Sequence, residues 1–367
     1  MTGIYIHIPF CIRKCPYCDF YSLPSDSGTR EEYTEALIKN ILMYKGRNIS
    51  ADTVYFGGGT PSLLSVSQVE RIISACAEAF MLDDPEITVE CNPDSTDREK
   101  LSGYRQAGVN RISFGIQSAQ DCELGFLGRP HSFSQARQAV YDAFKAGFEN
   151  ISGDVMLGLA GQTYVSLRDT LDKLCKMPLS HISAYMLKIE EGTPFDCERV
   201  KNSVAGEDEL CEMYLQTVEF LEDRGFKQYE ISNFARDNKI SRHNMKYWRC
   251  CEYLGFGASA HSFFEGKRFY CPSGVGEYIC GGAQKNVILE EAPDRTQEYI
   301  MLGLRLSEGV KLEKLCALAG EDFSRKFIQR SRILEQNGLC RIRDGAVSLT
   351  PRGFLVSNSI ICQLADS

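Results

Sequence analysis

The chain has 367 residues, of which 43% are hydrophobic and 25% charged, and its formal net charge is -8. This composition is that of a globular protein with a sizeable core. The acidic balance excludes a broad basic surface of the kind that binds nucleic acid or an anionic membrane, so we expect small molecules and proteins as partners.

No export signal and no membrane span are expected from the sequence. The N-terminus has neither a charged leader before an apolar stretch nor a small-residue cleavage site, and no run of about 18 apolar residues occurs. In such a chain the 16 cysteines are better explained as reduced thiols and metal ligands than as a disulfide framework. We therefore predict a cytoplasmic protein without an integral membrane segment.

The first chemical motif is residues 5–20, where an apolar strand runs directly into Cys11, Cys15 and Cys18. The three cysteines could share one helix face. However, Pro16 lacks a backbone donor and pushes Cys15 towards extended geometry, so we predict a loop. Three thiolates on one loop indicate a soft metal.

Two kinds of site fit three thiolates. A structural zinc site needs a fourth ligand, for which His7 is the nearby candidate. A four-iron, four-sulfur cluster bound by three thiolates instead keeps one iron open for a further ligand, as catalytic metal sites do. The cysteine spacing favours the cluster but is not unique to it.

After the cysteine loop, strands and helices alternate. A helix is predicted at residues 33–44, then a buried strand at 52–56 that ends in a glycine triplet, then a helix from Ser67 with a Ser67–Glu70 capping box. Further strands are predicted at residues 86–90, 111–117, 151–159, 181–189 and 229–234, and further helices at 96–107, 134–146 and 165–175.

This βα repeat predicts an α/β fold with a parallel sheet, and we interpret it as an incomplete (β/α)6-type barrel rather than a doubly wound sheet. In a barrel, chemistry lies at the carboxyl ends of the strands. The cysteine loop, the glycine triplet, Glu90, Gln117 and Asp154 all fall at or near such ends. We therefore expect them to line one site.

The pattern changes near residue 290. Helices are predicted at 295–306, 312–319 and 321–337, followed by a hairpin at 340–349 with an Asp-Gly turn, which resembles a small winged-helix unit. Basic and acidic residues balance there and form no basic stripe, so we predict a lid or docking role and no nucleic acid. The expected domains are the barrel (1–235), a connecting region rich in glycine and aromatic residues (236–289) and this winged-helix-like unit (290–367).

The glycine triplet, residues 57–59, is followed by Thr60 and Pro61. Bare backbone at a strand end suits a charged ligand that approaches main-chain groups, although a tight turn would explain it equally well. Together with the cysteine loop, the stretch resembles the radical S-adenosylmethionine (SAM) superfamily. In that superfamily the methionine part of SAM chelates the open iron and the glycine motif contacts the SAM amino group.

Further motifs are similar to the family of oxygen-independent coproporphyrinogen III dehydrogenase and its haem-chaperone branch. They lie at residues 6–11, 111–118, 128–131, 154–159 and 255–262. The resemblance implies a [4Fe-4S] cluster on Cys11, Cys15 and Cys18. It implies SAM contacts at Tyr5, Tyr17, Gly58, Gly59, Thr60, Glu90, Gln117, Arg129 and Asp154. The chemistry is compatible, because carboxylates bind ribose hydroxyls and an arginine pairs with the SAM carboxylate.

Two departures from the dehydrogenase pattern favour the haem-chaperone branch. The dehydrogenase carries a fourth cysteine where this chain has Phe20. Residues 243–248 resemble the His-Asn-x-x-Tyr-Trp signature of the haem-chaperone branch, although a buried structural His-Trp pair is the alternative. An imidazole can ligate haem iron and an indole can lie against the macrocycle, so we expect haem at His243 and Trp248, with His261 as the reserve ligand.

The resemblance therefore implies a haem chaperone that binds haem, a [4Fe-4S] cluster and SAM and delivers haem to acceptor haemoproteins. The alternative is an oxygen-independent coproporphyrinogen III dehydrogenase, an enzyme that decarboxylates its substrate oxidatively through a 5′-deoxyadenosyl radical. Whether SAM is cleaved in the function is left open.

Overall fold

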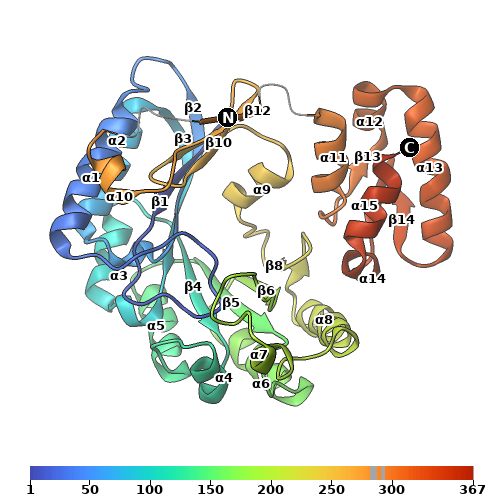
Figure 1. Cartoon of the computed structure of the whole chain (residues 1–367), viewed down its shortest axis with the longest axis horizontal. Coiled ribbons are helices and arrows are strands. Elements are labelled where there is room, and N and C mark those ends of the chain that lie inside the picture. The colour runs from blue at the N-terminus through green and yellow to red at the C-terminus, as the bar shows by residue number, and fades with distance from the viewer. Residues whose placement is uncertain (282–286, 291–293, 367) are drawn as a thin grey trace.

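The structure is a computed structural model that describes residues 1–281, 287–290 and 294–366 (Figure 1). Its centre is a run of six neighbouring parallel strands, each paired with the next in chain order. The strands are β1 (Thr2–Ile8), β2 (Ser50–Gly58), β3 (Met81–Cys91), β4 (Arg111–Gln117), β5 (Asn150–Leu157) and β6 (His181–Met186). The predicted α/β barrel with a parallel sheet is confirmed.

Helices connect these strands and cover the outside of the sheet (Figure 1). They are α1 (Ser27–Leu42), α2 (Val66–Ala79), α3 (Arg98–Gln106), α4 (Asp121–Phe126), α5 (Phe133–Lys145) and α6 (Tyr164–Cys175). The capping box of α2 is formed by Ser65 and Gln68 rather than by the predicted Ser67 and Glu70. Both pairs have the three-residue spacing that the motif requires, and the structure uses the earlier one.

Alternation along the strands divides the barrel into an apolar outside and a polar inside. On β1, Ile4, Ile6 and Ile8 are fully buried in the main hydrophobic core. The residues between them face inward, where the hydroxyl of Tyr5 lies 3.0 Å from Nδ1 of His7. The barrel interior is therefore lined with groups that can hydrogen-bond to one another or to a ligand.

The sheet does not continue as the sequence predicted. The strand expected at 229–234 is replaced by two short strands, β7 (Lys227–Gln228) and β8 (Asn233–Ala235), and β8 runs antiparallel to β6. The seventh strand is thus not a further parallel strand of the barrel. It follows the long helix α8 (Glu207–Glu222), and a tight turn folds it back on itself.

The connecting region completes the other edge of the same sheet. Strand β9 (Tyr253–Phe256) lies parallel to β1, and β10 (His261–Phe264), β11 (Lys267–Tyr270) and β12 (Val287–Glu290) follow it in antiparallel order. The short helix α10 (Val275–Ile279) packs on α1. The domain boundaries at 235 and 289 stay predictions.

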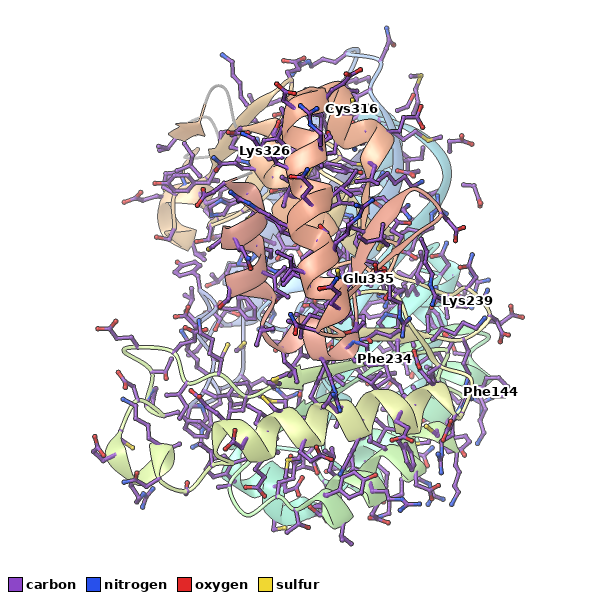
Figure 2. All side chains as sticks on the ribbon, turned by 90° about the vertical axis from the view of Figure 1, so that its right-hand side faces the viewer. Phe144, Phe234, Lys239, Cys316, Lys326 and Glu335 are labelled. Atoms are coloured by element: carbon purple, nitrogen blue, oxygen red, sulfur yellow. The ribbon has the colours of Figure 1, made fainter. Side chains whose placement is uncertain are left out.

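The C-terminal unit contains the helices and the hairpin that the sequence predicted. It comprises α11 (Arg295–Gly303), β13 (Val310–Lys311), α12 (Leu312–Ala319), α13 (Glu321–Gln336), β14 (Cys340–Arg343), β15 (Ala346–Leu349), α14 (Pro351–Leu355) and α15 (Ser357–Ala365). The exposed side of α13 carries both signs of charge, as Lys326 and Glu335 illustrate (Figure 2).

This unit docks on the segment that precedes the connecting strands. Arg249 forms a two-point ion pair with Glu308, at 2.9 and 3.0 Å, and the backbone N–H of Ile231 donates to the carbonyl of Arg305. In the part of the chain that the structure describes, no helix has the length and apolar character needed to cross a membrane.

Candidate functional site

The cysteine loop lies at the carboxyl end of β1 and is irregular, as the position of Pro16 predicted. Its base is closed by two backbone hydrogen bonds, from Cys11 N to the carbonyl of Leu23 (3.1 Å) and from Leu23 N to that of Pro9 (2.9 Å). Pro16 packs on Gly128, whose φ is +67° and where a Cβ would lie 2.9 Å from the proline Cδ. The glycine therefore allows the loop to approach the barrel rim.

The three thiols of the loop do not converge on one point. Within residues 1–281, 287–290 and 294–366, no group of three or more His, Cys, Asp or Glu side chains is placed to hold one metal ion. A structural zinc site requires such convergence, with all ligands at about 2.0–2.3 Å from one ion. In a four-iron cluster each thiolate binds a different iron, so the sulfurs stay apart. The assignment of the three thiols to a cluster stays a prediction.

The glycine triplet brings the end of β2 against the end of β1. A Cβ on Gly59 would lie 2.6 Å from the Phe10 carbonyl oxygen, and one on Gly58, where φ is +115°, would lie 2.6 Å from the His7 ring. The backbone N–H groups are already engaged, that of Gly59 with the Ile8 carbonyl and that of Thr60 with the Phe10 carbonyl. The loop would therefore bind a ligand through its carbonyl oxygens, which can accept hydrogen bonds from an ammonium group.

A cavity of about 430 Å³ opens between the cysteine loop and the strand ends. Eight of the nine predicted SAM contacts line it: Tyr17, Gly58, Gly59, Thr60, Glu90, Gln117, Arg129 and Asp154. Several further residues of the wall were not predicted from the sequence, among them the polar side chains of Asn92, Ser113 and Tyr185. Each lies on, or directly after, a predicted strand, and the spacing of two residues between Asn92 and Glu90 is the signal that could have identified Asn92.

Tyr5 is the predicted contact that is absent from the cavity wall. Its ring lies 6.3 Å from the ring of Tyr55 and 6.3 Å from that of His243, and its hydroxyl meets His7. Tyr5 therefore belongs to a layer of rings inside the barrel, behind the glycine loop.

The carboxylates of the wall are buried enough to change their ionisation. Burial raises the pKa of Glu90 from 4.5 to about 7, although Glu90 accepts hydrogen bonds from the Tyr55 hydroxyl (2.7 Å) and the Gly58 N–H (3.3 Å). Burial also raises the pKa of Asp154 to about 6. Hydrogen bonds donated by a ligand, such as those of ribose hydroxyls, would therefore stabilise the ionised form of both carboxylates.

Arg129 is fixed across the cavity from the glycine loop. Its Nη2 donates to the Gly115 carbonyl (3.0 Å) and to Asn92 Oδ1 (2.7 Å), and its Nη1 lies 3.6 Å from the Cys15 sulfur. Its Nε is buried and has no hydrogen-bond partner. Because a buried unpaired donor is costly, this position fits an anionic ligand group.

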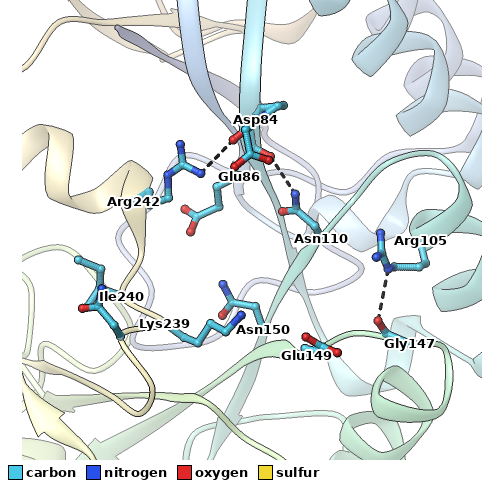
Figure 3. A pocket seen from close by; sticks show the side chains of 12 residues that line it. Asp84, Glu86, Arg105, Asn110, Gly147, Glu149, Asn150, Lys239, Ile240 and Arg242 are labelled. Atoms are coloured by element: carbon cyan, nitrogen blue, oxygen red, sulfur yellow. Dashed lines mark hydrogen bonds between the residues drawn. The ribbon is translucent and has the colours of Figure 1, made fainter.

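A second hollow of about 410 Å³ lies at the opposite, amino ends of the strands (Figure 3). Three of its side chains donate to backbone carbonyls, Arg242 to that of Asp84 (2.9 Å), Arg105 to that of Gly147 (3.3 Å) and Asn110 to that of Pro85 (2.8 Å). None of the predicted site residues lines it. These contacts connect neighbouring segments at the amino ends of the barrel strands.

The structure argues against His243 as a haem ligand. This residue lies on α9 (Arg242–Trp248), is 1% exposed and has both ring nitrogens paired, Nδ1 with Thr53 Oγ1 and Nε2 with the Tyr247 hydroxyl, each at 2.8 Å. Burial lowers its pKa to about 3, helped by the nearby Lys246 and Arg111. The structural alternative considered for this motif fits the geometry better, because no lone pair is left for iron.

Trp248 and His261 differ from His243 in accessibility. Trp248 is half-buried at the end of α9. His261 is exposed at the start of β10, where its ring stacks on Tyr270 at 5.3 Å between centroids. The other four histidines of the chain, His7, His131, His181 and His243, are buried. Because β10 runs antiparallel to β9, His261 lies at the same end of the barrel as the cysteine loop.

Two family models match parts of the chain, and full-length relatives match almost all of it. The radical SAM superfamily model matches residues 5–174, and the HemN C-terminal domain model matches residues 291–356. The chain is 34% identical over 371 residues to the heme chaperone HemW of Bacillus subtilis, with 98% of each chain covered. It is 36% identical over 331 residues to the heme chaperone HemW of Synechocystis sp., covering 86% of this chain and 80% of that protein.

A mitochondrial relative and a solved structure extend these similarities. The chain is 35% identical over 333 residues to radical S-adenosyl methionine domain-containing protein 1 of Danio rerio, covering 84% of this chain and 74% of that protein. The structure of coproporphyrinogen III oxidase (HemN) from Escherichia coli matches with a TM-score of 0.83 at 20% identity, covering 100% of this chain and 90% of that one. This last likeness shows the fold.

Proposed function

Because the chain belongs to the HemW family of radical SAM proteins, we propose that it is a haem chaperone that binds haem and delivers it to acceptor haemoproteins. The observation that carries the proposal is the 34% identity to a protein named heme chaperone HemW over 98% of both chains. Phe20, in the position of the dehydrogenase's fourth cysteine, supports the same branch. The cytoplasmic location remains a prediction from the sequence.

The cavity at the carboxyl end of the barrel is the proposed cofactor site. Cys11, Cys15 and Cys18 would hold a [4Fe-4S] cluster, and SAM would occupy the adjoining cavity. When bound, the two supply one-electron chemistry. Glu90 and Asp154 would accept hydrogen bonds from the ribose, and the loop carbonyls would accept them from the amino group.

The unpaired Nε of Arg129 supports an ionic contact with the carboxylate of SAM. An arginine donor that is buried without a partner gains a charge-assisted hydrogen bond when a carboxylate arrives. Because Arg129 is largely buried in the wall, such a pair would be stronger there than in solution.

For haem, we prefer His261 over His243 as the axial ligand. His261 is the exposed histidine of the chain, and Tyr270 supports its ring from one side. A haem bound there would lie at the same end of the barrel as the proposed cluster. In this proposal Trp248 and the buried His243 stabilise α9 rather than bind the macrocycle.

The test is a haem titration of the anaerobically reconstituted chain, followed in the Soret region. We expect binding near one haem per chain, an altered spectrum for His261→Ala, and a spectrum for folded His243→Ala that matches the unmodified protein. Transfer of the bound haem to an apo-haemoprotein is the functional readout. Conversion of coproporphyrinogen III to protoporphyrinogen IX by the cluster-loaded protein with SAM and reductant would replace the proposal with the dehydrogenase alternative.

A further inference from the structure

We propose that Asn92 is a positioning residue that orients hydrogen bonds onto two cluster-binding cysteines and thereby raises the reduction potential of the cluster. The inference rests on the [4Fe-4S] cluster of the proposed function. Asn92 directly follows β3, two residues after Glu90, and it lies in the cavity wall between the glycine loop and Arg129.

The side-chain amide of Asn92 connects the two sides of the cysteine loop. Its Oδ1 lies 2.7 Å from Arg129 Nη2, and its Nδ2 lies 3.3 Å from Thr60 Oγ1. Beyond these contacts, Arg129 Nη1 lies 3.6 Å from the Cys15 sulfur and Thr60 Oγ1 lies 3.5 Å from the Cys11 sulfur. One amide thus joins Cys11 and Cys15 through two hydrogen-bonding groups.

The chemistry of these groups fixes the direction of the hydrogen bonds that Asn92 makes, and a Cys11 thiolate bound to a cluster could only accept from Thr60. The guanidinium of Arg129 has no acceptor, so the oxygen of the Asn92 amide must face it and the nitrogen must face Thr60. Thr60 then accepts from Asn92, which leaves its hydroxyl proton free to point at the Cys11 sulfur. The backbone N–H of Asn92, which donates to Ser62 Oγ at 3.1 Å, holds the residue in this place.

Hydrogen bonds to a cysteine sulfur stabilise the more negative, reduced state of an iron–sulfur cluster and so raise its reduction potential. Thr60 is 4% exposed, so water cannot readily take over its hydrogen bond if it turns away. Replacing the Asn92 amide by a carboxylate should reverse the direction of the hydrogen bond between residue 92 and Thr60. The Thr60 hydroxyl would donate to the carboxylate instead of to Cys11, and the added negative charge would disfavour reduction further.

The test is a redox titration of the reconstituted full-length protein, monitored by the electron paramagnetic resonance signal of the reduced cluster, without SAM. Asn92→Asp should shift the midpoint potential to more negative values, Asn92→Ala should shift it less, and Thr60→Val should shift it in the same direction. Thr60→Ser keeps the hydroxyl, so its midpoint potential should equal that of the unmodified protein. Asn337→Asp, at an exposed position at the end of α13 in the C-terminal unit, is the control for the added charge.

Iron content separates the possible failures. If unmodified protein takes up no four-iron cluster, the proposed cofactor site falls and this inference falls with it. If the variants keep full iron content and their midpoint potentials equal that of the unmodified protein, the cluster assignment stands and the role of Asn92 is overturned. Thr60→Val removes the hydroxyl that lies between Asn92 and Cys11. A folding defect in one Asn92 variant therefore does not decide the outcome.

Discussion

The wall of the cofactor cavity and helix α9 use similar polar side chains in opposite ways. In the cavity wall, Arg129 keeps a buried N–H without a partner, and burial raises the pKa of Glu90. On α9, both nitrogens of His243 are paired within the protein. The difference teaches that residue type alone does not identify a ligand. What distinguishes the cavity wall here is a buried donor that is left without a partner beside a cavity.

The largest expected effect is at the cysteine loop. Cys15→Ala should abolish the broad visible absorbance and the iron content of the reconstituted protein, because a cluster held by three thiolates has no substitute ligand in the loop. Cys197→Ala, at an exposed cysteine outside the loop, should leave both unchanged. Stoichiometric zinc and no iron in anaerobically purified protein would contradict the assignment of the cluster.

The next largest effect is on folding and tests α9 directly. His243→Ala should lower the free energy of unfolding by about 2–4 kcal/mol, because it leaves a cavity and removes the partner of the Thr53 and Tyr247 hydroxyls. His261→Ala, at an exposed position, should change it by less than about 0.5 kcal/mol. Denaturant unfolding of the protein without haem measures both. Equal effects would mean that the burial contrast between the two histidines is wrong.

A smaller effect is expected on ligand affinity in the cavity wall. Asp154→Asn should weaken SAM binding about tenfold, equivalent to about 1.4 kcal/mol, because a neutral amide accepts hydrogen bonds less strongly than a carboxylate. Calorimetry on cluster-loaded protein measures the affinity, and the iron content should stay constant. Asp169→Asn is the matched control on the exposed side of α6. Undiminished affinity in Asp154→Asn would remove this carboxylate from the site.

The last expected effect is a pH dependence of stability in the absence of SAM. The pKa of Glu90 is raised from 4.5 to about 7 in the folded state, so the stability that its protonated form contributes is complete below about pH 4.5. That contribution is lost as the pH rises to about 7. Glu90→Gln should remain neutral and lack this loss, so its stability relative to the unmodified protein should rise by about 1–3 kcal/mol between pH 4.5 and 7.

Thermal unfolding of both proteins across this pH range measures the difference. The carboxyl of Asp154 titrates in both proteins and largely cancels from the comparison. A stability difference that stays constant from pH 4.5 to 7 would show that Glu90 is ionised throughout and that the wall is more hydrated than its contacts imply.

The sequence by itself determined the cofactor end of the barrel. The spacing of Cys11, Cys15 and Cys18 and the position of Pro16 are properties of one short segment, and the segment is a loop as expected. Glu90 and Gln117 end predicted strands, and Asp154 lies within the strand predicted at 151–159. Since parallel strands carry their carboxyl ends to the same edge, the order of strands and helices was enough to bring these side chains to one cavity.

Only the tertiary structure decided how the barrel edges and its amino end are built. The pairing of β9 with β1 joins segments about 250 residues apart, and the reversal of β8 against β6 depends on a turn, so neither leaves a periodic signal in the chain. The same holds for His243 and His261. A motif gives the type of side chain, but its partners, here Thr53 and Tyr247, come from packing, and that packing decides whether an imidazole faces the core or a ligand.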